Sequence, residues 1–261
     1  MFKRIAFTIV FNGKHHLEHN NHIEEILPYF DHWVFAEGFS MPVGSTSWCK
    51  DIMTDVSDNG SSIDGTLEFL IDLKRKYPDK ITIIKSNTGY WKGKDVQVNA
   101  CIDILKSYTN NAFLWEFDVD EHWTIENIIK SETMLKDNNA NTLNCKCNFY
   151  VGDDLIVQDG WGGDCVWVRL WNWNGETFSS HEPPILNRNN IVLNSNEKLF
   201  NHYAYYFEKD VEFKSKYYGG HENVFENWKT INMLPIDNFP IPVSRLFGNS
   251  NYSGIIVKEE I

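Results

Sequence analysis

Four carboxylates stand within six positions of the chain, directly after an apolar run. The stretch FLWEFDVDEHW, which begins at Phe113, contains Glu116, Asp118, Asp120 and Glu121. Side chains alternate along a strand, so a strand through this stretch would place Glu116, Asp118 and Asp120 on one face. Carboxylates this close repel one another by roughly several kcal/mol in a low-dielectric strand end. The cluster therefore predicts a bound cation; the alternative is a polar strand end whose carboxylates cap a helix that starts near Thr124.

The ligand types in this cluster indicate which cation would bind. Carboxylate oxygens are hard ligands that favour Mg²⁺ or Mn²⁺, and an added imidazole would shift the preference toward Mn²⁺. Two histidines of the second half are candidates for that position, His202 first and His181 second. His202, within NHYAYYF, is equally well explained as a hydrogen-bonded histidine of the core.

The elements around the cluster alternate between strand and helix patterns. Strands are predicted at 4–12, 32–38, 80–86 and 111–120, and helices at 19–30, 64–77 and 94–108. This order predicts a parallel sheet covered by helices, with ligands outside the carboxyl ends of its strands. The acidic cluster follows one of those ends.

Two regions depart from this alternation. Residues 39–62 are rich in Gly, Ser, Asp and Pro, which predicts a long ordered loop near the ligand crevice that closes on a bound ligand. After position 142 the pattern is one of mixed strands and turns, then a polar loop over 187–197 and a helical region over 209–228. We interpret residues 1–261 as a single domain with two halves, 1–123 and 124–261.

Bulk composition excludes several classes of protein. The formal net charge is -12, with 36 Asp and Glu against 24 Lys and Arg and no basic run, which argues against a nucleic-acid duplex as ligand. No apolar stretch is long enough for a transmembrane segment. The five cysteines are odd in number and lack zinc-ribbon spacing, so we expect structural thiols and a cytoplasmic protein.

Two motifs of the first half resemble those of a known enzyme class. Asp118-Val119-Asp120 resembles the DxD motif of GT-A glycosyltransferases, in which carboxylates hold a divalent metal that bridges the diphosphate of a nucleotide sugar. Upstream, SSIDGTLEFL resembles the SxDGT segment of glycosyltransferase family 2, with Asp64 as its acid. The triplet alone is a weak signal, and the second motif strengthens it.

A further segment resembles the helix that faces the nucleotide in that family. It is KGKDVQVNACIDI, which contains Lys94, Gln97 and Asn99. Family 2 also has an acid at the end of the second strand, followed closely by SxDGT; here Glu37 is followed by the long 39–62 segment. The resemblance implies that the nucleotide sugar is bound by Glu37, Asp64, Lys94, Gln97, Asn99 and Asp118.

The second half resembles the acceptor half of family-2 enzymes such as the lipopolysaccharide core glucosyltransferases. Those enzymes have an Arg-Leu-aromatic strand, a His-Glu pair and a His-Tyr pair, and the matching positions here are Arg169-Leu170-Trp171, His181-Glu182 and His202-Tyr203. In order and rough spacing the match runs from Ile5 to about Tyr218. It implies an α/β fold of the GT-A (Rossmann-like) type, with a mostly parallel sheet flanked by helices and a mixed acceptor-side half.

The resemblance also implies a reaction. It is the metal-dependent, inverting transfer of a hexose from a nucleotide-diphosphate sugar, with a UDP-sugar favoured, to a glycan acceptor. A divalent ion on Asp118 or Asp120 would stabilise the charge on the leaving diphosphate. The acceptor hydroxyl must lose its proton to a carboxylate base, for which Glu182 is the first candidate and Asp164, in GWGGD, the second.

Trp161 and Arg169 are the candidate acceptor-binding residues of the second half. Trp161 stands between glycines, whereas the neighbouring tryptophans alternate in part like a buried strand. Plainer explanations exist for two of the motifs. The His181-Glu182 pair precedes two prolines and could be a surface turn, and Asp64 could be only a helix N-cap.

Two other functions fit part of the pattern. A non-catalytic carbohydrate-binding protein on the same fold would have no need of the costly acidic cluster. A sugar nucleotidyltransferase would need a Gly-rich basic loop after the first strand, but FNGKHHLEHN has one glycine and no arginine. The carboxylates and histidines of both halves therefore favour the transferase.

Overall fold

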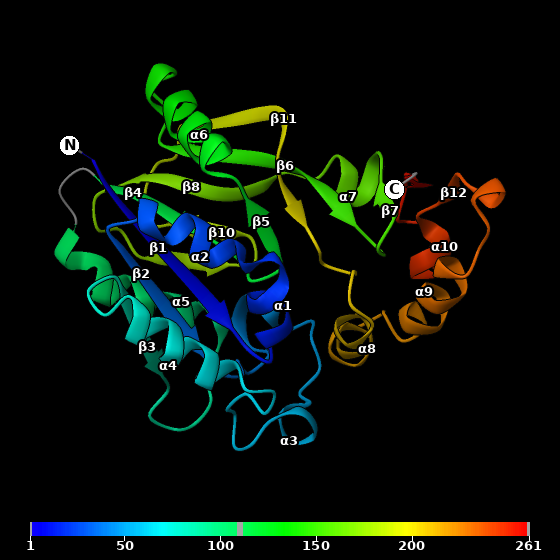
Figure 1. Ribbon diagram of the computed structural model, residues 1–261, viewed down its shortest axis with the longest axis horizontal. Helices are drawn as coiled ribbons and strands as arrows, with labels where there is room; N and C mark the ends of the chain where they lie inside the picture. Colours follow the sequence, from blue (N-terminus) through cyan, green and yellow to red (C-terminus); the bar gives the residue numbers. More distant parts are fainter. Residues whose placement is uncertain (1, 109–111, 260–261) are drawn as a thin grey trace. The chain divides into compact units, whose positions relative to one another are not determined.

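The computed structural model describes residues 2–108 and 112–259 (Figure 1). By its internal contacts the chain divides into two compact units. The first comprises 1–144 and 168–194, and the second comprises 145–167 and 195–261. The predicted halves, 1–123 and 124–261, concern which ligand each half binds, and they stay a prediction.

The first unit contains the predicted α/β sheet. Its main strands are β1 (Lys3–Val10), β2 (His32–Glu37), β3 (Ile81–Lys85), β4 (Ala112–Glu116) and β8 (Trp167–Trp173). They lie in the order β3-β2-β1-β4-β8; the first four are parallel, and β8 is antiparallel to β4. The order 3-2-1-4 is that of doubly wound sheets, which bind ligands outside the carboxyl ends of the strands. The prediction of a mostly parallel α/β sheet is confirmed.

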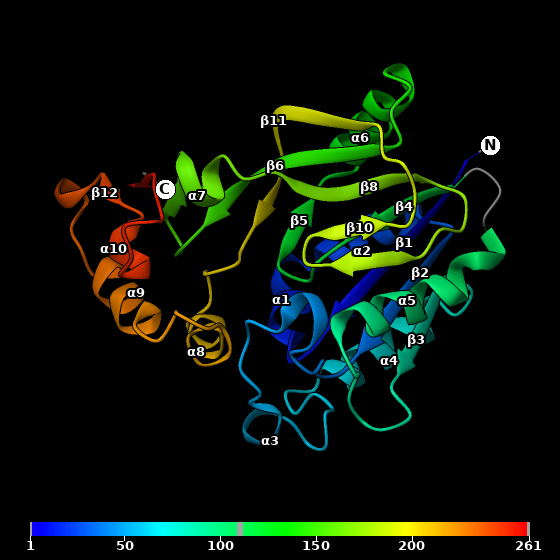
Figure 2. The ribbon, with the colours of Figure 1, turned by 180° about the vertical axis from the view of Figure 1, so that it is seen from behind.

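Helices cover both faces of this sheet. They are α1 (Lys14–Glu18), α2 (His22–Ile26), α3 (Met53–Val56), α4 (Thr66–Lys76), α5 (Lys94–Leu105) and α6 (Ile125–Asp137), with 3-10 turns η1 (His19–Asn21), η2 (Leu27–Tyr29), η3 (Gly44–Thr46) and η4 (Lys106–Tyr108). Helix α2 lies in front of the strands in Figure 1, and α5 lies in front of them in Figure 2. Every residue of β2 and β4 is buried, as expected for strands that are covered on both faces.

The alternation of side chains along the strands divides the core into two layers. Toward α5, Val34 and Ala36 of β2 pack in one cluster with Val98 and Ile102 of the helix. On the opposite face of β2, Trp33 stacks on Phe35 with 5.5 Å between ring centroids. The continuous apolar run of β2 therefore supplies side chains to both layers of the core.

Strand β4 is shorter than predicted, and this changes the geometry of the acidic cluster. The strand ends at Glu116, and Asp118 and Asp120 lie beyond it in a turn that leads into β5 (Glu121–Trp123). The expectation that Glu116, Asp118 and Asp120 share one strand face is therefore wrong. Phe117 and Val119 continue the apolar alternation past the end of the backbone ladder, which explains why the pattern did not reveal the strand end.

The polar segment predicted as a loop over 187–197 is partly strand. The remaining strands of the first unit are β9 (Phe178–His181), β10 (Pro184–Leu186) and the beginnings of β6 (Thr142–Tyr150) and β11 (Val192–His202). Strand β11 pairs with β5 and β6, and Asn144 Nδ2 donates to Asn194 Oδ1 over 2.8 Å. A strand with a solvent-facing side can carry as many polar residues as a loop, so composition alone could not separate the two.

Segment 39–62 is tied to the sheet at several points. Ser62 N donates to Glu37 Oε1, at the end of β2, over 2.8 Å, and Met41 N donates to Trp91 O over 2.9 Å. Asn12, after β1, donates through Nδ2 to Val56 O over 2.9 Å. The segment is thus an ordered excursion between β2 and α4, and its closure on a ligand stays a prediction.

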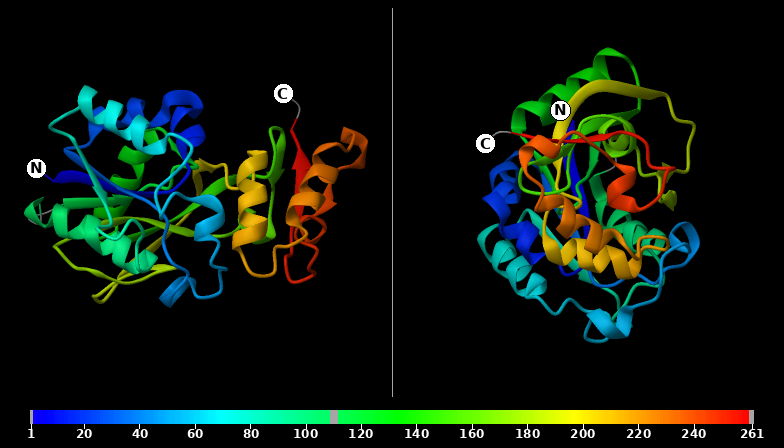
Figure 3. Two further views of the ribbon diagram at one scale, coloured as in Figure 1. Left: turned by 90° about the horizontal axis from the view of Figure 1, so that it is seen from below. Right: turned by 90° about the vertical axis from the view of Figure 1, so that its right-hand side faces the viewer.

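The second unit is built around antiparallel strands and short helices. Its elements are the ends of β6 and β11, then β7 (Leu155–Val157), α7 (Gly160–Gly163), α8 (Glu208–Tyr217), α9 (Val224–Asn232), η5 (Ile236–Asn238), β12 (Ile241–Pro242), α10 (Ser244–Phe247) and β13 (Ile255–Lys258). Strand β7 pairs with β6 and β13, and α9 packs against α8 and α10 (Figure 3). The helical region predicted over 209–228 corresponds to α8 and most of α9, with a turn between them.

Two expectations from composition can be compared with the structure. Across 2–108 and 112–259, no helix has both the length and the apolar character that crossing a membrane requires. All five cysteines are free thiols, four of them buried and Cys165 partly exposed. A cytoplasmic location stays a prediction.

Candidate active site

The acidic cluster has a cationic partner within the chain. Arg169, on β8 beside β4, contacts Asp118 Oδ2 through Nη2 and Glu121 Oε1 through Nε, each over 2.7 Å. The arginine is 4 % exposed and Glu121 is fully buried. Burial alone would lower the pKa of Arg169, but the carboxylates of Glu121, Asp118 and Glu116 outweigh it and raise that pKa well above its usual value. Arg169 therefore relieves much of the repulsion from which we inferred a bound cation, and its role in binding an acceptor stays a prediction.

A buried carboxylate and histidine connect the acidic cluster with the predicted His-Glu pair. His181, the last residue of β9, lies with Nε2 2.7 Å from Glu116 Oε1. Both side chains are buried, and His181 Nδ1 has no hydrogen-bond partner among the residues that the structure describes. A carboxylate behind one imidazole nitrogen orients the ring and makes the other nitrogen a better metal ligand or proton acceptor.

Glu182 forms an ion pair with the first residue of α5. Its Oε1 atom lies 2.8 Å from Lys94 Nζ and 3.8 Å from His181 Nδ1. Partial burial by itself raises the pKa of Glu182, but Lys94 and His181 together outweigh this effect and lower the pKa to about 2. Glu182 is therefore ionised at neutral pH and a weak base while Lys94 holds it.

Helix α5 uses one face to hold the β9 strand and the turn after it. Asn99 makes two hydrogen bonds to the backbone of Phe178, accepting from its N over 2.8 Å and donating to its O over 3.0 Å. Asp95 Oδ1 accepts from His181 N over 2.9 Å. With the Lys94–Glu182 pair, these bonds attach the whole of β9 to the helix. In the structure, Lys94 and Asn99, predicted to face the nucleotide, contact this strand and its turn.

Gln97, also on α5, forms hydrogen bonds to the backbone at the end of β2. Its Nε2 donates to Ala36 O over 2.9 Å and to Gly38 O over 3.2 Å, and its Oε1 accepts from Ser40 Oγ. The side chain is buried. Gln97 thus supports the backbone at the carboxyl edge of the sheet, and its contact with a nucleotide sugar stays a prediction.

The two acids predicted on the donor side form structural bonds between strand ends. Glu37 Oε1 accepts from Ser62 N over 2.8 Å, and its Oε2 lies 3.6 Å from Lys85 Nζ. Asp64 Oδ2 accepts from Lys14 N over 3.1 Å, while its Oδ1 accepts from Thr66 N over 3.0 Å. Asp64 stands one residue before Gly65, the N-cap of α4, and accepts from the amide of Thr66, the first residue of the helix. It thus joins the start of α4 to the segment after β1, and its contact with a nucleotide sugar stays a prediction.

The predicted metal ligands are only partly brought together. Asp118 and Asp120 lie in the turn after β4, and one oxygen of Asp118 is bound by Arg169. Asp118, Asp120 and His181 do not bring three ligand atoms within 4.8 Å of one another in the described parts of the first unit. The donor set nevertheless fits a divalent ion in kind, because it combines hard carboxylate oxygens with a carboxylate-backed imidazole.

His202, Asp164 and Trp161 belong to the second unit and have partners there. His202 is 6 % exposed and packs edge-on against Trp167 and Phe149, with 4.9 and 5.1 Å between ring centroids. Asp164 accepts from Gly160 N over 2.9 Å and pairs with Lys146 over 3.1 Å; these contacts lower its pKa. His202 is thus surrounded as a core histidine is.

Trp161 lies among other rings of the second unit. Its ring meets Phe247 edge-on with 4.4 Å between centroids and Tyr252 with 5.1 Å. It is only partly exposed. Its position between glycines therefore reflects a bend in the chain, since Gly162 adopts φ +89 and carries no side chain to clash with Phe149.

Sequence reasoning missed three features of the site: the Arg169 pairings, the Glu116–His181 bond and the role of Asp95. The sequence contains one indication of the Arg169 pairings. In WVRLWNW a single cation interrupts an apolar strand, and a buried arginine requires buried carboxylates. The other two join residues 65 and 86 positions apart in the chain, a distance that periodicity cannot bridge.

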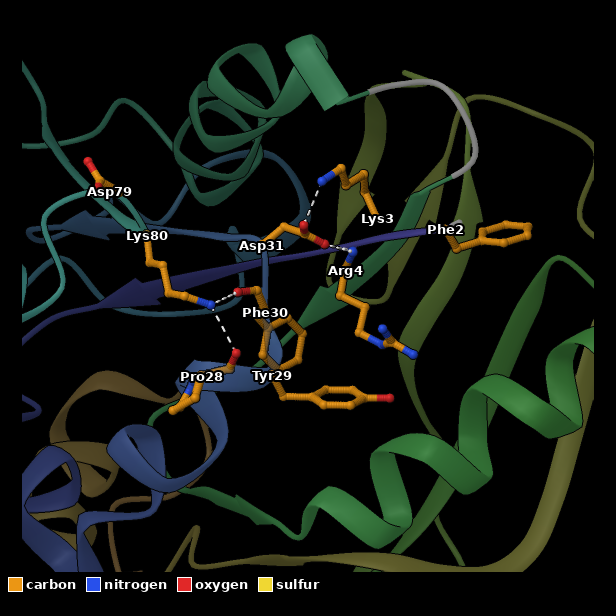
Figure 4. Close-up of a pocket in the computed structure, with 9 residues that line it drawn as sticks. All are labelled: Phe2, Lys3, Arg4, Pro28, Tyr29, Phe30, Asp31, Asp79 and Lys80. Atoms are coloured by element: carbon orange, nitrogen blue, oxygen red, sulfur yellow. Dashed lines mark hydrogen bonds and ion pairs between the residues drawn. The ribbon is translucent and has the colours of Figure 1, made fainter.

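A pocket of about 440 Å³ lies at the opposite, amino edge of the sheet (Figure 4). Its lining residues come from the start of β1 and the segments before β2 and β3. Its cations already have partners: Lys3 pairs with Asp31 over 2.7 Å, and Lys80 Nζ donates to Pro28 O over 2.9 Å. Arg4 Nε donates to Glu132 over 3.0 Å. Each of these three cations is therefore already held by an oxygen atom of the protein.

No family model matches the sequence, and no curated protein matches it. Among solved structures the chain is similar to S. aureus TarS 1–349, with 12% identity over 96% of this chain and 73% of that one and a TM-score of 0.46. TarS 1–349 in complex with UDP gives 11% identity, coverage of 91% and 68%, and a TM-score of 0.44. A cytidylyltransferase of Francisella tularensis gives 11% identity, coverage of 94% and 85%, and a TM-score of 0.33. All three scores are below 0.5, so the assignment of function rests on the residues of the site.

Proposed function

We propose that the chain is a glycosyltransferase that moves a hexose, with inversion, from a nucleotide-diphosphate sugar to a glycan acceptor. The reaction would occur outside the carboxyl ends of β1, β2 and β4. A UDP-sugar is the favoured donor. The proposal is based on the motifs of the sequence and on how the first unit groups them.

One observation carries the proposal. The 2.7 Å contact between Glu116 and His181 joins the end of β4, two residues before the Asp118-Val119-Asp120 motif, to the His-Glu pair, which resembles an acceptor motif. Both lie at the edge where doubly wound sheets bind ligands. A carbohydrate-binding protein would have no use for three buried or half-buried carboxylates around one arginine, because such groups are costly to bury.

Asp118 and Asp120 are the residues proposed to hold Mn²⁺ or Mg²⁺, with His181 as the candidate imidazole. When bound, the ion would supply positive charge to the leaving diphosphate. Arg169 would hold Asp118 through Oδ2, so that Oδ1 of Asp118 could bind the ion. Glu116 would keep the His181 ring in one orientation.

Glu182 is proposed as the base that accepts the proton of the acceptor hydroxyl. Lys94 holds it as a carboxylate, the form that can accept a proton. An anionic donor beside α5 would compete for Lys94 and so release Glu182. Loss of that ion pair would make the carboxylate more basic, since Lys94 is the main opposing influence on its pKa.

The test is a transfer assay with a panel of UDP, GDP and dTDP sugars, with Mn²⁺ or Mg²⁺ and with chelator. We expect release of the nucleoside diphosphate from one donor, dependent on metal, and its loss in Asp120→Asn with the fold unchanged. Near wild-type turnover in chelated buffer would contradict the metal assignment. Donor binding without turnover for any acceptor would favour the carbohydrate-binding alternative.

A further inference from the structure

Asp95 joins two distant segments through one oxygen atom. It lies in the first turn of α5, and its Oδ1 accepts from Ser45 Oγ over 2.8 Å and from His181 N over 2.9 Å. Ser45 belongs to segment 39–62, whereas His181 ends β9 and precedes the proposed base. Asp95 Oδ1 therefore links segment 39–62 to the turn that contains His181 and Glu182.

Segment 39–62 packs closely against Asp95, and hydrogen bonds connect this contact to an exposed residue. Gly44, with φ +61, precedes Ser45, and a Cβ at this position would lie 3.0 Å from Asp95 Oδ2. A side chain there would thus be strained and crowded. Trp48 Nε1 donates to Ser45 O over 3.2 Å, and Trp48 is 51% exposed. A surface residue of the segment is therefore two hydrogen bonds away from Asp95.

On the side of the turn, the bond acts on the backbone. The side chains of His181 and Glu182 are held by Glu116 and Lys94, but these contacts end in rotatable side chains. The bond from His181 N to Asp95 fixes the main chain itself, one residue before Glu182. Loss of this bond would therefore loosen the backbone from which both the imidazole and the carboxylate project.

We propose that Asp95 is a positioning residue that couples segment 39–62 to the His181–Glu182 turn. It sets the geometry of the proposed base according to the position of the segment. The inference rests on the proposed function, because the turn matters only if it carries out the chemistry. Asp95 itself touches no reacting atom.

The plainer role for Asp95 is that of an acid in the first turn of a helix, which stabilises the helix through its dipole. The two roles differ in what each substitution does. Asp95→Asn removes the charge but keeps the oxygen that accepts both bonds, whereas Asp95→Ala removes both. Ser45→Ala breaks only the link to the segment. Asp103→Ala, on the same helix, breaks the local pair with Lys106 and serves as the matched control.

The first experiment is hydrogen exchange at the His181 amide, which needs no enzymatic activity. We expect about tenfold faster exchange in Asp95→Ala, near wild-type exchange in Asp95→Asn and Asp103→Ala, and an intermediate increase in Ser45→Ala. Coupling also requires that Ser45→Ala add nothing in the Asp95→Ala background. Unchanged exchange in Ser45→Ala, or equal effects of Asp95→Asn and Asp95→Ala, would overturn the proposal.

The second experiment measures transfer by the same variants. Asp95→Ala should lower kcat by about tenfold or more with little change in the donor KM, and Asp95→Asn should restore it to within about threefold. A wild type without transferase activity would refute the proposed function and leave the exchange result to decide the coupling. Rescue of exchange without rescue of kcat would overturn the positioning role.

Discussion

The two edges of the first unit's sheet both carry charged residues, but they use them differently. At the amino edge each cation has a local partner, as in Lys3 with Asp31. At the carboxyl edge one buried arginine serves Asp118 and Glu121, with Glu116 also nearby, and Glu116 in turn holds His181. Pairs at a surface contribute little to stability, while buried charge is costly and demands a reason. The proposed function assigns the donor to the carboxyl edge, where one cation serves several carboxylates.

The largest expected effect is on catalysis at the carboxyl edge. Glu182→Gln keeps the shape of the side chain but cannot accept the proton, so the rate of transfer should fall by about two to four orders of magnitude. Donor affinity, measured separately, should be retained or rise, because Asp118 and Asp120 are unchanged and Lys94 no longer pairs with a carboxylate at position 182.

Asp164→Asn is the matched control for the base. Its carboxylate is already occupied by Lys146 and Gly160 N, so a mild effect is expected. Should Asp164→Asn stop turnover while Glu182→Gln remains active, the base lies in the second unit and the assignment of the His-Glu pair is wrong.

The next effect is on stability. Arg169→Met leaves Glu121 buried without its cation, which should lower the free energy of unfolding by about 3–5 kcal/mol in urea titrations. At the amino edge, Lys3→Met removes an exposed partner of Asp31 and should cause little measurable change. Similar losses from the two substitutions would remove the distinction between the edges.

A smaller effect is expected from pH. His22 packs on His122 with 3.8 Å between ring centroids, and burial, reinforced by His16 and His19, lowers its pKa from 6.5 to about 4. The unfolded chain binds the proton first, so this contribution to stability is present above pH 6.5 and is lost as the pH falls toward 4. Its full size is on the order of 3 kcal/mol.

The measurement is the free energy of unfolding between pH 7 and pH 4. In His22→Gln the slope over this range should flatten. His32→Gln, at the start of β2, should flatten it less, because burial lowers the pKa of His32 while a hydrogen bond with the backbone of Asp79 opposes this effect. An unchanged slope in His22→Gln would show that this histidine does not titrate differently in the two states.

Features that depend on neighbouring residues in the chain could be predicted from the sequence, whereas contacts between distant residues could not. The strands and helices of the α/β sheet follow from the local apolar pattern; β2, for example, is a continuous apolar run from Trp33 to Ala36, as expected for a strand that is buried on both faces. The end of β4 did not follow, because the alternation continues through Phe117 where the ladder stops. Strand β11 was hidden by its polar composition.

The candidate site was predictable in its residue types but not in its pairings. Asp118, His181 and Glu182 all belong to the first unit, although the sequence placed Asp118 in one half and the His-Glu pair in the other. The partners Arg169, Lys94 and Asp95 were either given other roles or overlooked, because their contacts depend on how α5 and β8 pack beside the strand ends. A buried cation such as Arg169 requires carboxylate partners, and this requirement accounts for part of the acidic cluster without a metal.

The most direct test of the central claim asks which edge of the sheet binds the donor. Titration calorimetry would measure the affinity for UDP with Mn²⁺ of the wild type, of Asp120→Asn at the carboxyl edge and of Lys80→Met in the amino-edge pocket, with thermal unfolding to check that both variants fold. We predict that Asp120→Asn loses binding by at least about tenfold, while Lys80→Met binds as the wild type does. Loss of binding in Lys80→Met with retention in Asp120→Asn would contradict the account.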